Sequence, residues 1–116
     1  MLTDDEMQEK IDDEIIVDAY DEYEQSMGWF YFFDETLENP FTATAQLKKR
    51  DGTTESKQVK VVGLASKEED FTNKDFNLEI EQGQYLRPIA YSALSAIKAS
   101  DETLEAFGIW DFHWRE

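Results

Sequence analysis

The residues of this sequence that could carry chemistry are mainly carboxylates. Its 116 residues include 27 Asp and Glu, a single histidine (His113) and no cysteine. A metal site built from thiolates or from several imidazoles is therefore impossible. Calcium needs neither, because this hard cation takes about six to eight oxygen ligands from carboxylates, carbonyls and water. The composition thus directs the search toward cation binding.

The first candidate cation site is formed by Asp34, Glu35 and Glu38, where a long predicted helix ends. In a continuous helix, residues 34 and 38 lie one turn apart on the same face. A helix end also presents free carbonyl oxygens, which calcium can bind. Negative side chains are unfavourable at this end of the helix dipole unless a cation is present. The alternative interpretation is a frayed, solvated helix end.

The second candidate is the acidic loop 68–75, in which Asp70, Asn73 and Asp75 could surround one ion. The loop is not an EF-hand, since Lys74 takes the fifth position and Asp75 replaces the required glycine. A solvated loop is the favoured interpretation here. The other acids of the helical region are interpreted as a solvated face: Glu14, Asp18, Asp21, Glu22 and Glu24.

Catalytic chemistry has little support in the sequence. His113 stands between aromatic neighbours, which is typical of a partly buried histidine rather than a general base. There is no Gly-x-Ser-x-Gly motif, and the five glycines are scattered singly instead of forming a phosphate loop. We therefore expect that the protein is not an enzyme.

The acidic residues are concentrated in the first third of the chain. Residues 1–38 hold 14 acids and one base, a net charge of −13, against −3 for residues 39–116. The electrostatic field of this negative charge repels nucleic-acid phosphates and anionic lipids, so we expect the protein to bind neither nucleic acid nor membranes. It leaves calcium ions or a basic protein as partners. The length fits one domain, and the absence of an apolar span or basic leader predicts a cytoplasmic protein. We also expect a monomer.

The secondary-structure pattern divides the chain into three parts. Residues 3–38 are predicted to be helical: a capping box at Thr3 begins a short helix, and a second helix runs from 18 to 37. Within it, Gly28 costs about 1 kcal/mol relative to alanine. The aromatic block 29–33 should dock on the rest of the domain.

Residues 41–98 change to a period of two, which is typical of half-buried strands. Turn signals at 50–53 and 82–83, with a tight helical turn at 92–94, delimit five antiparallel strands. Ser100 caps a C-terminal helix over 101–114. The sequence therefore predicts an α+β fold: a small five-stranded antiparallel SH3-like barrel with an N-terminal helical arm and a short C-terminal helix.

Several segments in order resemble a known family. They are DAYDEYEQ at 18–25, GWFYF at 28–32, PFTATA at 40–45, KKRDG at 48–52 and VVGLA at 61–65. Together they resemble the small acidic calcium-binding proteins of cyanobacteria, the CcbP type, from about residue 12 to the Trp-rich end.

The resemblance implies calcium binding without EF-hands by a cytosolic calcium buffer or regulator. It also implies that the acids between the aromatic block and the first strand are ligands, which here are Asp34, Glu35 and Glu38. The alternative function is an acidic interaction module that binds a basic partner.

Overall fold

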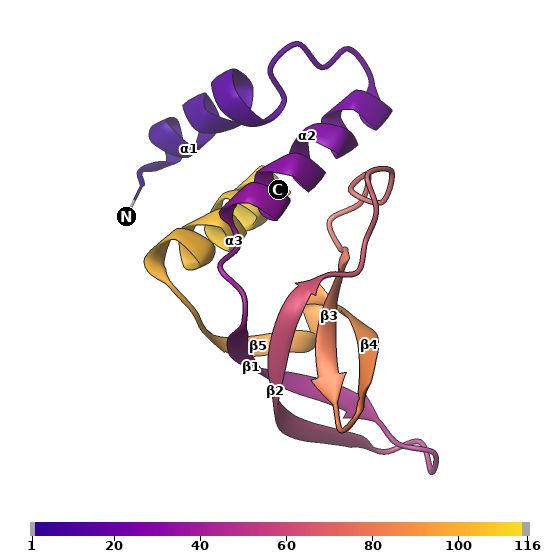
Figure 1. Cartoon of the computed structure of the whole chain (residues 1–116). Coiled ribbons are helices and arrows are strands. Elements are labelled where there is room, and N and C mark those ends of the chain that lie inside the picture. Colours follow the sequence, from indigo (N-terminus) through magenta and orange to yellow (C-terminus); the bar gives the residue numbers. More distant parts are fainter. Residues whose placement is uncertain (1, 115–116) are drawn as a thin grey trace.

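Helices gather at one end of the molecule, and an antiparallel sheet forms the other end (Figure 1). The computed structural model describes residues 2–114. Within this range the helical elements are α1 (Asp4–Lys10), a π-helical turn η1 (Ile11–Ile15), α2 (Glu22–Thr36) and α3 (Asp101–His113). Figure 1 shows α3 beside α2, with the N-terminal arm of α1 and η1 on the outside of this pair.

The N-terminal helix starts as its sequence predicts. The Thr3 hydroxyl accepts a hydrogen bond from the Glu6 N–H at 3.2 Å, and the Glu6 carboxylate accepts one from the Thr3 N–H at 3.3 Å. This reciprocal pair is the capping box, which satisfies two N–H groups that the helix leaves free.

The second helix begins later than its periodicity predicts. Asp18 has a φ of 61°, a left-handed conformation that interrupts the helical path. The helix restarts after Asp21, whose side chain accepts a hydrogen bond from the Glu24 N–H at 2.8 Å and so caps α2. The predicted start at residue 18 is therefore wrong, while the end at Thr36 is one residue from the prediction.

Gly28 allows the N-terminal arm to approach α2 closely. A Cβ atom at this position would overlap the backbone carbonyl oxygen of Ile15, at the end of η1. The glycine therefore places η1 directly against α2, where any other residue would push it away. This contact sets the position of the acidic residues of η1 relative to the last turns of α2.

The sheet follows the predicted strand pattern closely. Its strands are β1 (Phe41–Lys48), β2 (Thr54–Leu64), β3 (Asn77–Gln82), β4 (Tyr85–Ala90) and β5 (Leu94–Lys98), with the short 3-10 turn η2 (Tyr91–Ala93) before β5. The order across the sheet is β4-β3-β2-β1-β5, with every pair antiparallel. Gly52 and Gly83 provide the positive φ angles, 89° and 63°, of the two hairpin turns.

The expected closed SH3-like barrel is wrong in one respect, because the sheet is open. Strands β4 and β5 lie at its two ends and are not paired with each other in residues 2–114. Pro88 removes one N–H donor from β4. In β5, Ala96 has a φ of 48°, and the pairing with β1 shifts register between Thr42 and Thr44. These irregularities prevent a continuous closing ladder.

The core lies between the helices and the sheet and is largely aromatic. Phe33 of α2 is fully buried, and its ring contacts Phe76 and Trp110 with centroid distances of 4.9 and 5.7 Å. Trp29 is 1% exposed and packs edge-on against Trp110 at 5.0 Å. The predicted docking of the aromatic block on the rest of the domain is thus confirmed. No helix in residues 2–114 is long and apolar enough to cross a membrane.

Candidate metal site

The end of α2 carries the first predicted cation cluster, but not in the expected arrangement. Asp34 and Glu35 lie exposed on its last turn. The helix stops at Thr36, because Leu37 takes extended backbone angles (φ −69°, ψ 125°) and buries its side chain in the core. Glu38 follows outside the helix, and its N–H donates to Thr103 Oγ1 at 2.9 Å. The expected one-turn spacing of Asp34 and Glu38 is therefore wrong.

The electrostatics of this helix end favour a cation. The last turn of α2 contains no basic residue, although its carbonyl groups give it a partial negative charge. Within residues 2–114 the ion pairs are Lys10–Glu105 at 3.8 Å and Lys60–Glu81 at 4.0 Å, so none of the three acids at this end has one. The carboxylates thus add negative charge to the C-terminal end of α2, where the helix dipole is already negative.

Glu35 also lines a pocket of about 460 Å³, and part of a second acidic element lines the same pocket. Glu14 of η1 and Thr36 line the same pocket. Lys10 lies on its wall, where its ammonium group is paired with Glu105 of α3. A hydrogen bond and the negative charge of Glu68 raise the pKa of Tyr31, another wall residue. The pocket is therefore lined by acidic residues from two separate segments, in a negative environment.

The donor atoms of this pocket fit calcium in kind. Glu14 and Glu35 provide carboxylate oxygens, and Thr36 provides a hydroxyl, all of which are oxygen donors that a hard cation prefers. Two bidentate carboxylates and one hydroxyl leave part of a shell of about six to eight ligands to water and carbonyls. In residues 2–114, no three His, Cys, Asp or Glu side chains already converge as a preformed metal site. Ion binding here would therefore require the exposed glutamates to reorient.

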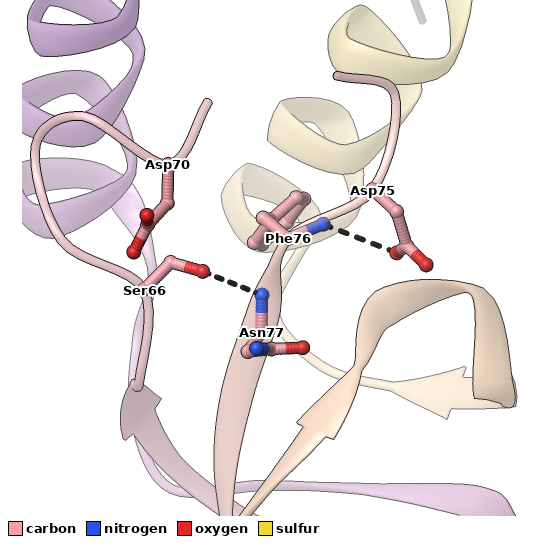
Figure 2. Close-up of a pocket in the computed structure, with 5 residues that line it drawn as sticks. All are labelled: Ser66, Asp70, Asp75, Phe76 and Asn77. Carbon is pink, nitrogen blue, oxygen red and sulfur yellow. Dashed lines mark hydrogen bonds between the residues drawn. The ribbon is translucent and has the colours of Figure 1, made fainter. Parts of the chain in front are cut away.

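The second predicted cluster is brought together only in part. Asp70 and Asp75 line one pocket of about 270 Å³ with Ser66, Phe76 and Asn77. Asn73 is exposed and lies outside this set. Figure 2 shows Asp70 and Asp75 on opposite sides of Phe76, with their carboxylates apart from each other.

Both loop carboxylates already hold the loop in place. Asp70 accepts a hydrogen bond from the Lys67 N–H at 2.7 Å. Asp75 accepts from the N–H groups of Phe76 and Ser92 at 3.1 and 3.0 Å, and from the Ser92 hydroxyl at 2.6 Å. These hydrogen bonds use part of the acceptor capacity of each carboxylate and fix its orientation, so the first role of the two residues is structural. The sequence analysis, which favoured a solvated loop here, did not predict this structural role.

His113 behaves as the partly buried histidine that the sequence indicates. Its ring lies 5.1 Å from that of Trp29, and desolvation lowers its pKa from 6.5, against a smaller opposing effect of Asp12. Below about pH 6.5, His113 therefore takes up a proton more readily in the unfolded chain than in the folded protein. Protonation of His113 thus favours unfolding, and the free energy of unfolding decreases as the pH falls.

A pH series should reveal this effect of His113. The stability advantage of the wild type over His113→Gln is expected to shrink between about pH 7.5 and pH 5, as measured by urea unfolding at each pH. The difference between the two proteins removes the common effect of the other acids. An advantage that is constant, or that grows at low pH, would contradict the assignment.

The chain belongs to the CcbP calcium-binding family, whose model matches residues 9–115.

Two solved structures are similar to this chain in both sequence and fold. The crystal structure of Anabaena CcbP is 37% identical, with a TM-score of 0.78 over 97% of this chain and 91% of that one. A calcium-binding protein in its calcium-binding form is 34% identical, with a TM-score of 0.71 over 98% of this chain and 94% of that one. None of the curated proteins matches the chain.

Proposed function

We propose that this protein binds calcium through carboxylates at the end of α2 and acts as a cytosolic calcium buffer or regulator. The observation that carries the proposal is the pocket that Glu35 and Glu14 both line, in a chain of the calcium-binding family. Asp34 and Glu38 flank this pocket in sequence and add negative charge around the ion. The protein needs no catalytic group for this function, and it would act as a monomer.

The proposed site is not an EF-hand. Its carboxylates come from two helical elements on either side of the 16–21 connection, rather than from one 12-residue loop. Gly28 holds these elements together through its contact with Ile15. When calcium binds, Glu14 and Glu35 would coordinate it, while water completes the ligand shell.

The loop acids form a second, weaker candidate site. Asp70 and Asp75 supply oxygen atoms around the pocket of the 66–77 segment, and Asn73, which lies outside its lining, would have to reorient to join them. Binding there would have to replace or share the hydrogen bonds that Asp75 accepts from Ser92. We therefore expect this site to fill at higher calcium concentrations than the site at the end of α2.

Calcium titration by calorimetry tests the proposal. We expect saturable binding with a dissociation constant of about 10⁻⁵ to 10⁻³ M, because few charged ligands converge and the exposed glutamates lose rotamer freedom. Magnesium should bind more weakly, since it gives up its water reluctantly. The absence of saturable heat with calcium, or equal affinity for magnesium, would reject a calcium-selective site.

A second function, an acidic module for a basic partner, is supported by one surface feature. Tyr20, Tyr23 and Tyr31 are 85%, 51% and 45% exposed beside the acids of α2. Exposed tyrosines with carboxylates are suited to a basic protein surface. Thermal stabilisation by polylysine but not by calcium would favour this function, whereas stabilisation by calcium favours the first.

A further inference from the structure

A different kind of pocket lies beside the C-terminal end of α3. Its volume is about 380 Å³, and its aromatic walls are the partly exposed rings of Tyr91 and Trp114, with the buried Trp110 also in the lining. Asp75 and Asp111 line the same space. This combination differs from the pocket at the end of α2, because apolar rings rather than oxygen atoms dominate it.

The walls of this pocket are fixed by hydrogen bonds and ring packing. Tyr91 Oη donates to both carboxylate oxygens of Asp111, at 3.0 and 3.1 Å. Trp110 Nε1 donates to the Lys74 carbonyl at 2.9 Å. The rings of Trp110 and Trp114 lie 5.6 Å apart. A ligand would therefore meet an arranged surface, which lowers the entropy cost of binding.

The carboxylate of Asp111 lacks a cationic partner within the described residues. The ion pairs found there join Lys10 to Glu105 and Lys60 to Glu81. Desolvation raises the pKa of Asp111, against an opposing effect of the Tyr91 hydrogen bond. A cation from outside would relieve this cost by pairing with Asp111.

We infer that this pocket binds the guanidinium group of an arginine side chain from a basic partner. A guanidinium group stacks on aromatic faces and pairs with carboxylates, so it matches both kinds of wall. Calcium does not, because aromatic rings supply none of the oxygen ligands that it requires. The inference concerns a site separate from the pocket of Glu14 and Glu35, and it does not rest on calcium binding.

Pocket size and the charge of the chain favour a peptide as the source of this group. A volume of about 380 Å³ admits one long side chain but not a folded element. The net charge of −16 attracts a partner with several positive charges more strongly than a small cation. The rest of a basic peptide would then lie over the surrounding acidic surface.

An NMR titration of the full chain tests this inference, with the indole N–H signals of the tryptophans as the readout. Excess chelator is present to remove calcium. The probe is an end-capped peptide with one arginine and two flanking lysines, and the control replaces arginine by the neutral isostere citrulline. We expect saturable shifts of the Trp110 and Trp114 signals with the arginine peptide, at least fivefold weaker binding of the citrulline peptide, and no shift of Trp29. The Trp114 signal is assigned as the indole signal that the Trp114→Phe variant lacks.

Two charge variants give opposite expected effects. Asp111→Asn should weaken binding of the arginine peptide at least threefold. Lys74→Gln, which removes a positive charge from the pocket lining, should strengthen its binding. The inference is overturned if both variants bind like the wild type, or if the citrulline peptide binds equally well. It is also overturned if the free cation agmatine matches the peptide, or if calcium alone produces the same shifts.

Discussion

The double variant Glu14→Gln, Glu35→Gln is expected to bind calcium at least about tenfold more weakly than the wild type. Each substitution removes a charged ligand from the pocket that the two residues share. A contact to a charged group contributes about 1.5–3 kcal/mol, and about 1.4 kcal/mol is a factor of ten. Both side chains are exposed, so the free energy of unfolding should change by less than about 0.5 kcal/mol.

The matched control is Glu9→Gln, Asp13→Asn. It removes the same two charges from exposed positions of the same N-terminal arm, outside the pocket. Only the general surface field changes, and salt screens that field, so the affinity should fall by less than about threefold. Equal losses in the two pairs would mean that calcium is held by diffuse attraction rather than at a site.

Gly28→Ala is expected to destabilise the protein by about 2 kcal/mol. Helix propensity alone predicts the opposite, a gain of about 1 kcal/mol. However, the new Cβ would overlap the backbone carbonyl of Ile15, and overpacking against a fixed neighbour costs about 1–3 kcal/mol or more. Because the overlap pushes η1 away from α2, the variant should also weaken calcium binding between Glu14 and Glu35.

Gly108→Ala is the matched control for that measurement. Gly108 lies in α3, is exposed, and has no neighbouring atom within 4 Å of an added Cβ. Urea unfolding should therefore show a gain of up to about 1 kcal/mol for Gly108→Ala and a loss for Gly28→Ala. A stabilised Gly28→Ala protein would contradict the close contact between η1 and α2.

The local elements of the fold could be predicted because their signals are local. Thr3 and Ser100 cap helices with their own neighbours, and Gly52 supplies a hairpin turn. The interruption at Asp18 could not be predicted, since Ile16, Tyr20 and Tyr23 continue the helical spacing across it. Closure of the sheet depended on pairing between β4 and β5, which only η2 separates along the chain but which lie at opposite ends of the sheet, and their local patterns do not determine whether they pair.

The candidate site was predictable in composition but not in arrangement. The sequence placed carboxylates at the end of α2, where Asp34 and Glu35 indeed lie. Glu38 left the helix because burial of Leu37 directs the chain toward β1. Glu14 appeared to belong to a solvated face, and only the close approach permitted by Gly28 places it in the lining of the same pocket as Glu35.

A crystal structure of the protein grown with calcium tests the central claim most directly. The proposed site predicts an ion between η1 and the end of α2, with carboxylate oxygens of Glu14 and Glu35 at about 2.3–2.6 Å. Calcium bound solely around Asp70 and Asp75, or an empty pocket at saturating calcium, would contradict it.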